Sequence, residues 1–555
     1  MDTINSSLID RSPNIVERLA KIVGDENVLG QSEALQIESK LAIPFHTAPA
    51  CIVRPTSAAQ VQEIMALANA TGSSVWVGSR GHNWGYGSKG ALQSQSIILL
   101  LDRLDKIHEV DSELGYAVVE PGVTYRQLAR YLDEHEIPLM VDPTDGPPDG
   151  SVLGNALDRG VGIARYSDHC ASLCGLEVVL PSGAVVQTGG GLLDNCKTFH
   201  TYRWGIGPSL DGLFSQSNYG VVVKAGIWLR PKPEEMLTFS FQIRENEMLS
   251  PAIDALAKLS REGVLEGGTH MCNDICQFAI FSQLKDESSG ELCSRLSIEG
   301  RQALRTKWDV PLFGVFGALY GRSEQLAAGR NILAQELGPY GRLEFFSKRK
   351  RRYIESVEKR LTDSPNGLFA KAMGRLSGKS VEVLRRHLRA AVEIEQLLQG
   401  KPSDYFVRHA YYRSPIQKPL LAKVPEDDIG LVWFAPIIPF RASDLSNVIS
   451  LTEPLFDEHN FDYYLALLFQ NARSMITLMA IFYDKHDPES NERAKLLLKQ
   501  CTSAIQDAGY IEYRTSLLGA SSAIPQGGAY AEVLRQLKAV FDPYGILSPG
   551  KYGIG

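Results

Sequence analysis

Residues 78–87 read Gly78-Ser-Arg-Gly-His-Asn-Trp-Gly-Tyr-Gly87, and they decide how the first half of the chain is interpreted. From Gly85 to Gly90 the sequence matches the dinucleotide fingerprint G-x-G-x-x-G. That fingerprint has to open a helix, whereas Ala91–Ser96 and the apolar run Ile97–Leu101 follow here. We therefore expect a loop instead of a nicotinamide-binding Rossmann motif. It is either a Gly-rich turn without a ligand, or a loop whose glycines let backbone N–H groups approach an anion closely.

Two further Gly-rich stretches lie in the same half of the chain. They read Asp149-Gly-Ser-Val-Leu-Gly-Asn155 and Gly212-Leu-Phe-Ser-Gln-Ser-Asn-Tyr-Gly220. Both combine small residues with amide or hydroxyl side chains and carry little charge. A single large polar ligand that contacts all three stretches explains them better than three turns without a ligand.

Composition indicates an ordinary globular protein. The chain has 555 residues, a net charge of −7, 44% apolar residues and 22% charged residues. This length suggests two or three domains. The acidic balance argues against a nucleic-acid partner, and we interpret the basic run Lys348–Arg352 as a solvated helix face.

The termini and the cysteines bear on location and metal binding. The sequence from Met1 to Lys21 has no signal-peptide pattern, and no apolar run approaches the ~18 residues of a membrane helix. We expect a cytoplasmic protein without membrane association. The eight cysteines are too sparse for a disulfide framework. The pairs Cys170/Cys174 and Cys272/Cys276 lack the partners of a zinc site, so we expect no metal.

Hydrophobic periodicity predicts an α/β first half and a different second half. Short strands are expected before Arg230-Pro-Lys-Pro233, and long amphipathic helices interleaved with aromatic-rich strands after it. The expected strands are 51–54, 74–77, 97–101, 116–120, 176–180, 184–187 and 221–229, and the expected helices are 56–70, 124–136, 322–337, 380–398 and 491–508.

The ordered motifs of this chain resemble the vanillyl-alcohol oxidase / para-cresol methylhydroxylase family of flavoproteins. The resemblance runs from about residue 50 to the C-terminus and is strongest in 75–235 and 505–555. It is carried by Gly85-Tyr-Gly87, Glu120-Pro-Gly-Val-Thr124, Gly150-Ser-Val-Leu-Gly-Asn155, Asp158-Arg-Gly-Val-Gly162, Gly212-Leu-Phe-Ser-Gln-Ser-Asn218, Glu512-Tyr-Arg-Thr515 and Asp542-Pro-Tyr-Gly-Ile-Leu-Ser-Pro-Gly-Lys551.

The resemblance implies an α+β, two-domain FAD-linked oxidase fold. Residues 1–235 would form an FAD-binding domain of two α/β subdomains. Residues 236–504 would form a substrate or cap domain with an antiparallel sheet and helices, and 505–555 would return to the FAD-binding domain.

The resemblance also implies which residues contact FAD. The pyrophosphate is expected on Ser79–Gly87, the ribityl chain and flavin on Ser151–Asn155 and Arg159–Gly162, and the adenine side on Ser215–Val222. The expected contacts are Ser79, Arg80, Gly81, His82, Asn83, Gly85, Ser151, Gly154, Asn155, Arg159, Gly162, Ser217, Gly220, Val222 and Lys551.

The phenol-oxidising members of the family hold their substrate as a phenolate between two tyrosines and an arginine, which match Tyr86, Tyr513 and Arg514. A free phenol has a pKa of ~10, so a fixed cation and hydroxyl donors are needed to favour the anion. Hydride then leaves the para-benzylic carbon for flavin N5, and a quinone methide remains. The family's base is an Asp, for which Asp145 is the first choice and Asp149 the second. A turn role in a Pro-Gly loop is the alternative for either carboxylate.

The chain departs from the family at the covalent flavin bond. The oxidases use a His and the cresol dehydrogenase a Tyr at the position that Leu431 occupies here, and leucine cannot form that bond. The berberine-bridge-like branch links flavin through a His in the pyrophosphate loop, and Arg80-Gly-His82 resembles that segment. We carry both hypotheses, a His82-linked flavin and a noncovalent FAD.

The expected function is FAD-dependent oxidation of a small para-substituted phenol, with O2 or another electron acceptor. An alternative is oxidation of an alcohol or a carboxylic acid, with or without decarboxylation, in which Arg514 pairs with a carboxylate. A flavin scaffold without turnover has no use for the catalytic residues. Relatives suggest a homodimer or a larger homo-oligomer. Several aromatic positions are candidates for either pocket or core: Tyr405, Tyr411, Tyr412, Phe461, Tyr463 and Phe469.

Overall fold

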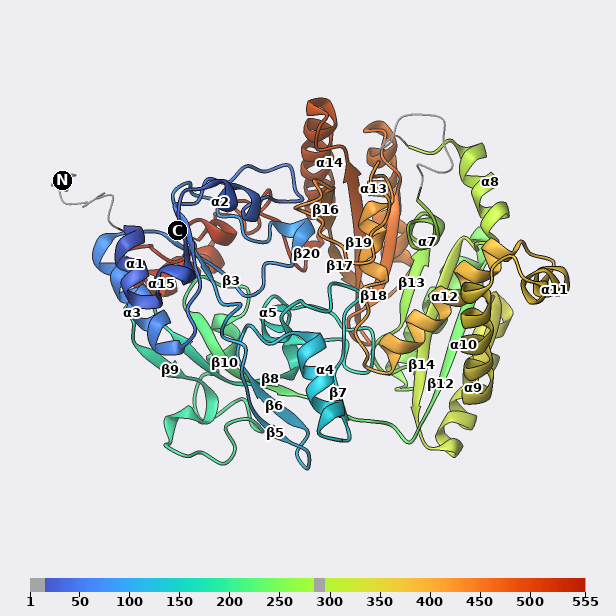
Figure 1. Cartoon of the computed structure of the whole chain (residues 1–555), viewed down its shortest axis with the longest axis horizontal. Coiled ribbons are helices and arrows are strands. Elements are labelled where there is room, and N and C mark those ends of the chain that lie inside the picture. The colour runs from blue at the N-terminus through green and yellow to red at the C-terminus, as the bar shows by residue number, and fades with distance from the viewer. Residues whose placement is uncertain (1–14, 284–294, 555) are drawn as a thin grey trace.

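The computed structural model describes residues 15–283 and 295–554, which form three main sheets. Two smaller sheets occupy one half of the molecule and a nine-stranded sheet with its helices occupies the other (Figure 1). The helices are α1 (Ile15–Val23), α2 (Glu33–Glu38), α3 (Ala58–Thr71), α4 (Tyr125–Glu134), α5 (Val152–Leu157), α6 (Leu249–Arg261), α7 (Asp274–Phe281), α8 (Ile298–Trp308), α9 (Ser323–Leu337), α10 (Lys348–Asp363), α11 (Leu368–Ser377), α12 (Val381–Leu398), α13 (Ala442–Glu458), α14 (Pro488–Asp507) and α15 (Ala529–Phe541).

The first sheet is four-stranded and places the Gly-rich loop 78–87 at a strand end. Its strands follow the order β1 (Val28–Leu29), β2 (Cys51–Val53), β4 (Ile97–Leu100), β3 (Val75–Gly78). Helix α3 starts at Ser57, whose side chain accepts from the Gln60 amide, and ends at Gly72, which has a φ of +63°. Strands β2 and β3 both pair with β4 in parallel, so the loop after β3 lies at the carboxyl edge of this sheet.

The second sheet is antiparallel and supports the other two Gly-rich stretches. Its order is β5 (Ile107–Asp111), β6 (Tyr116–Val119), β10 (Val221–Trp228), β8 (Leu173–Val179), β9 (Val185–Gln187). Two short strands, β7 (Leu139–Met140) and β11 (Arg230–Pro231), pair with each other nearby.

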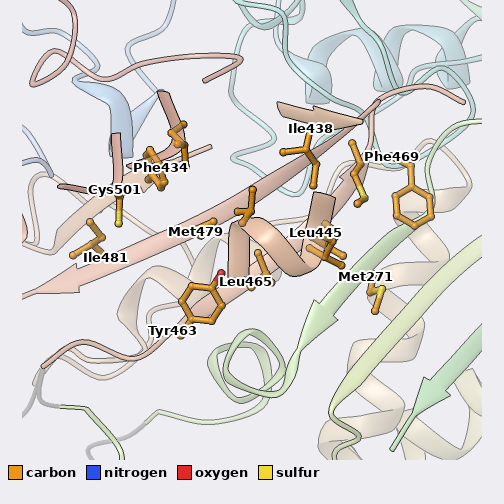
Figure 2. Packing of buried hydrophobic residues seen from close by; sticks show 14 of the residues in the cluster. Met271, Phe434, Ile438, Leu445, Tyr463, Leu465, Phe469, Met479, Ile481 and Cys501 are labelled. Carbon is orange, nitrogen blue, oxygen red and sulfur yellow. The ribbon is translucent and has the colours of Figure 1, made fainter. Parts of the chain in front are cut away.

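The third sheet has nine antiparallel strands. Its order is β15 (Arg342–Phe346), β12 (Glu235–Ile243), β14 (Phe313–Gly321), β13 (His270–Asn273), β18 (Tyr464–Phe469), β19 (Ser474–Tyr483), β17 (Pro436–Pro439), β20 (Ile511–Glu512), with β16 (Gly430–Phe434) also paired to β19. One face of this sheet packs against apolar residues of α6, α9, α13 and α14. Figure 2 shows part of this core, in which Leu445 of α13 and Cys501 of α14 lie beside strand residues such as Met479.

The C-terminal segment joins the large sheet to the first sheet. Strand β20 pairs with β17, whereas Leu547 forms a parallel bridge with Val75 of β3. In Figure 1 the C-terminus and α15 lie beside α1 and α3. The last fifty residues therefore run between both halves of the molecule, which places Tyr513 and Arg514 at their junction.

The structure tests two expectations from the sequence, the absence of a Rossmann motif after Gly85 and the solvated face of the basic run Lys348–Arg352. No helix follows Gly90, since a 3-10 turn (Trp84–Tyr86) precedes it and β4 is the next regular element, so the rejection of the Rossmann motif is confirmed. The basic run does begin a helix, α10, but the prediction of a solvated face is wrong for Arg351. That side chain is 12% exposed and pairs with buried Glu395 at 2.6 Å.

Candidate active site

The three Gly-rich stretches converge, because their glycines allow close approach. Gly81 and Gly87 have φ values of +67° and +119°, a region that favours glycine. A Cβ on Gly154 would lie 2.1 Å from the Ser79 hydroxyl oxygen, so the loop after β3 and helix α5 come together only because that side chain is missing. Ser151 caps α5 by accepting from the Gly154 amide at 2.7 Å.

A cavity of about 390 Å³ lies between these stretches, the C-terminal segment and the nine-stranded sheet. Most of the residues predicted from the sequence line it. These are Ser79, Arg80, Gly81, His82, Asn83, Tyr86, Asp145, Ser151, Gly154, Asn155, Ser217, Gly220, Val222, Tyr513, Arg514 and Lys551.

Three of the predicted FAD contacts lie outside this lining. Gly85 packs against Trp433, since a Cβ there would lie 2.2 Å from Cδ1 of the indole. Gly162 packs in the same way against Asp142, with 2.3 Å to its carboxyl carbon. Arg159 is exposed and has a φ of +53°.

Buried polar atoms in the cavity wall lack protein partners. An unpaired buried polar group costs about 1–3 kcal/mol, so several on one wall indicate a polar ligand. Among the described residues, the unpartnered atoms on the lining are His82 Nδ1, Tyr86 Oη, Ser88 Oγ, Ser217 Oγ and Ser516 Oγ.

Arg514 lies between two tyrosine rings. Its guanidinium carbon is 5.2 Å from the ring centre of Tyr86 and 5.1 Å from that of Tyr513, within cation–π range. Nε and Nη2 donate to the Asp158 carbonyl at 2.9 and 2.6 Å, and Nε lies 3.0 Å from the Asp158 carboxylate. Asn83 donates to the same carboxylate at 2.9 Å. The cation is therefore buried and fixed against the two phenol rings.

The Tyr86 hydroxyl stays protonated near neutral pH. Burial raises its pKa well above the usual value of 10, and nearby Tyr513 adds to this, while Arg514 opposes it. A protonated hydroxyl can donate a hydrogen bond to an anionic oxygen in the cavity.

The two candidate bases differ in their surroundings. Asp145 lines the cavity, and burial raises the pKa of its carboxyl to about 6. Asp149 lies outside the lining and forms a two-point ion pair with Arg126, at 2.9 and 3.2 Å. Although burial opposes it, this pair lowers the pKa of Asp149. Only Asp145 combines access to the cavity with a pKa suited to proton transfer near neutral pH.

Both residues that bear on flavin attachment line the cavity. Leu431 lies in β16, 2% exposed. Burial, together with the charge of Arg80, lowers the pKa of His82 to about 4, and the imidazole is therefore neutral.

Apart from Leu431, the sequence did not reveal the contribution of the 236–504 region to the wall. That contribution consists of Val407, His409, Ala410, Leu431, Trp433, Leu468 and Leu478. His409 is 8% exposed, burial lowers its pKa to about 3, and its ring centre lies 5.5 Å from that of Trp433. A lone His in an aromatic segment gives no sequence signal of a pocket. The six aromatic positions left open between pocket and core all lie outside the lining.

Within residues 15–283 and 295–554, no group of His, Cys, Asp and Glu side chains is arranged to hold a metal ion. Nor is any helix of that region long and apolar enough to cross a bilayer.

Comparison with family models gives two matches. Residues 49–189 match the FAD binding domain, and residues 432–552 match the C-terminal domain of FAD linked oxidases. The glycine cradle and the unpartnered polar atoms fit such a cofactor, because a dinucleotide offers many hydrogen-bonding groups over a long surface.

Curated proteins and solved structures match over nearly the whole chain. A 1'-carboxy-chondrochloren decarboxylase from Chondromyces crocatus is 30% identical over 96% of this chain and 94% of its own. The 4-cresol dehydrogenase [hydroxylating] flavoprotein subunit of Pseudomonas putida is 27% identical over 97% and 95%. A p-cresol methylhydroxylase structure with substrate bound superposes with a TM-score of 0.83, 25% identity and coverage of 98% and 96%. The 4-ethylphenol oxidase of Gulosibacter chungangensis has the same fold, with a TM-score of 0.84, 24% identity and coverage of 100% and 98%.

Proposed function

This chain belongs to the FAD-linked oxidoreductases of the vanillyl-alcohol oxidase / para-cresol methylhydroxylase family, and we propose that it oxidises a para-substituted phenol. It is an FAD-dependent oxidoreductase with the two-domain α+β fold of that family. The proposed substrates are 4-alkylphenols or 4-hydroxybenzyl alcohols. The relatives named for cresol oxidation support this class.

The convergence of Tyr86, Tyr513 and Arg514 on one cavity carries this proposal. The buried guanidinium lowers the pKa of a bound phenol, and the Tyr86 hydroxyl donates to the phenolate oxygen. Bound FAD supplies the two-electron oxidant that accepts a hydride from the substrate. The negative ring makes the para-benzylic carbon a better hydride donor, so charge fixed at one end of the substrate promotes chemistry at the other.

Asp145 is the proposed base. Oxidation leaves a quinone methide, which gains a hydroxyl group when water adds to the benzylic carbon. A carboxylate on the cavity wall can take the proton from that water. Its raised pKa, about 6, leaves it mostly ionised at neutral pH.

Binding of a non-oxidisable phenol tests the phenolate site. We expect 4-bromophenol, added to the FAD-loaded protein at pH 7, to give the ultraviolet difference band of a phenolate. Its methyl ether, 4-bromoanisole, should give none. A bound phenol with the spectrum of the neutral form would contradict the proposal.

The decarboxylase relative supports a second candidate, oxidative decarboxylation of a carboxylic acid. Arg514 suits a carboxylate as well as a phenolate, because its planar fork can donate two parallel hydrogen bonds. Release of CO2 from 4-hydroxyphenyl acids distinguishes the candidates. We expect 4-alkylphenols to be turned over without a carboxyl group, whereas strict dependence on that group would favour the second.

The mode of FAD attachment has two candidates, a bond through His82 and noncovalent binding. Leucine at position 431 cannot form the usual covalent bond of the family, which supports noncovalent binding. The neutral imidazole of His82 lines the cavity, which supports a bond through that residue. Acid precipitation decides between them. Yellow colour retained in the pellet of the wild type but released by His82→Ala would assign the bond, and release by both proteins would exclude it.

The electron acceptor, the assembly, the domain limits and the location are proposed from the same relationship. The acceptor is O2 or another electron carrier, the assembly a homodimer or larger homo-oligomer, and the functional units 1–235, 236–504 and 505–555. The change of sheet at β12 supports the first limit. A cytoplasmic location is supported by the free thiols of all seven described cysteines.

A further inference from the structure

We propose that His169 is a positioning residue, which holds the Asn155 amide so that its N–H groups face the FAD cavity. The inference rests on FAD binding and is independent of the substrate.

Three side chains form a hydrogen-bonded relay at the cavity wall. Asn155, in α5, and Tyr125 both line the cavity, whereas His169 is buried and lies outside the lining. The Asn155 Oδ1 atom lies 2.6 Å from Nδ1 of His169, and the Tyr125 hydroxyl lies 3.0 Å from the same nitrogen. Asn155 and Tyr125 thus reach the cavity, and His169 holds both of them from behind the wall.

The hydrogen-bond roles follow from the acceptor character of Oδ1. A carbonyl oxygen only accepts, so Nδ1 of His169 carries the proton. Burial lowers the pKa of this histidine, although Asp142 opposes it, so the ring is neutral, and its second nitrogen, Nε2, faces Asp142. That nitrogen lies 3.9 Å from Asp142, whose two carboxylate oxygens already accept from the backbone N–H groups of Ala164, Tyr166 and Ser167.

Two glycines make room for the relay. A Cβ on Gly160 would lie 1.9 Å from Asn155 Oδ1, and one on Gly162 would lie 2.4 Å from His169 Nε2. Within Asp158-Arg-Gly-Val-Gly162, the glycines therefore accommodate the polar network behind the wall, and Gly162 has no place in the cavity lining.

The consequence concerns the free end of the amide. With Oδ1 held by His169, the amide nitrogen of Asn155 is left to donate to acceptor atoms of the cofactor. Without His169 the amide can turn and present its oxygen, which repels the same acceptors. A lost hydrogen bond of this kind weakens binding by about tenfold.

Reconstitution of the FAD-free protein tests this role. We expect His169→Leu to raise the FAD dissociation constant about tenfold and to shift the flavin absorbance bands and midpoint potential. His169→Asn, which retains a side-chain N–H donor, should restore most of the affinity. Wild-type affinity and potential in His169→Leu would overturn the inference.

His459→Leu is the matched control. His459 is as buried as His169, at 7% exposed, and its ring also pairs with a side-chain amide, at 2.7 Å from Gln500 Oε1, away from the cavity. An equal loss of FAD affinity in this control would overturn a specific role for His169.

Asn155→Asp keeps the inference testable if His169→Leu fails to fold. It leaves an oxygen for His169 and replaces the amide donor with a negatively charged carboxylate oxygen. We expect weaker FAD binding, and unchanged binding would overturn the inference.

Discussion

At the scale of the residue, the phenol site depends on the Tyr86 hydroxyl, for which residues 15–283 and 295–554 provide no hydrogen-bond partner. Tyr86→Phe removes that hydroxyl and keeps the ring over Arg514. We expect flavin reduction by 4-ethylphenol to slow by about tenfold to a hundredfold, because a hydrogen bond to a charged group contributes about 1.5–3 kcal/mol. Stopped-flow absorbance measures this rate.

Tyr412→Phe is the control for that substitution. The Tyr412 hydroxyl is likewise buried and unpartnered among the described residues, but it does not line the cavity. Its removal should leave the rate unchanged. Equal slowing in both variants would show that the Tyr86 hydroxyl has no particular role.

The raised pKa of Asp145 predicts that the rate of product formation depends on pH. Its carboxyl has a pKa raised to about 6, so the base form is present above that pH and is lost below it. The rate of product formation should therefore rise with pH, with its midpoint near pH 6, and reach a plateau at higher pH. Asp145→Asn should remove this rise, the limb of the pH–rate profile near pH 6, and lower the plateau rate by about a hundredfold.

Asp149→Asn serves as the comparison for Asp145. Because Asp149 is held in its ion pair with Arg126, the limb near pH 6 should persist in this variant. Loss of the limb in Asp149→Asn instead would assign the base to the second aspartate.

At the scale of the element, helix α15 fastens the C-terminal segment to the loop 215–222. Lys538, 3% exposed, pairs with fully buried Asp542 at 2.6 Å and donates to the carbonyls of Asn218 and Leu547. Lys538→Met leaves a buried carboxylate without its cation, which costs about 3–5 kcal/mol. Urea unfolding should show this loss, together with faster FAD release.

Lys495→Met on α14 is the control for that substitution. Its ion pair with Glu492 is exposed, at 41% and 72%, so its loss should cost less than about 1 kcal/mol. A similar cost for both lysines would contradict the role of α15 as a fastening element.

The sequence predicts the limits of helices and strands better than it predicts which residues pack against them. The strand predicted over 97–101 corresponds to β4, and the helix predicted over 380–398 corresponds to α12. The observed and predicted limits of both elements agree within one residue. Helix α14 starts at Pro488, three residues before its predicted start, because Asp487 caps it and proline is favoured in its first turn.

The parts of the site that lacked a sequence signal share one physical reason. Glycine spacing indicates that something approaches closely, but it does not say whether the neighbour is a ligand or a side chain such as Ser79, which lies against Gly154. Gly162 accommodates His169, and Arg351 in a basic run pairs with a glutamate from another helix. Such partners are distant in sequence, so periodicity and composition do not reveal them.

At the scale of the whole molecule, the cavity lies where both halves and the C-terminal segment meet. A cofactor bound there contacts all three parts, so FAD should stabilise the chain as a unit. At a free FAD concentration one hundred times the dissociation constant, we expect about 2.7 kcal/mol of added stability. Thermal unfolding of the FAD-free protein across an FAD titration checks this, and a midpoint independent of FAD would contradict it.

The most direct test of the central claim is anaerobic mixing of the FAD-loaded protein with 4-ethylphenol and with its methyl ether, 4-ethylanisole. A second pair, vanillyl alcohol and its O-methylated counterpart, extends the comparison, and flavin absorbance is followed in each case. The phenolate site predicts that the free phenols alone bleach the flavin. Equal bleaching by the methyl ethers, or an oxidised flavin with all four compounds, would contradict the account.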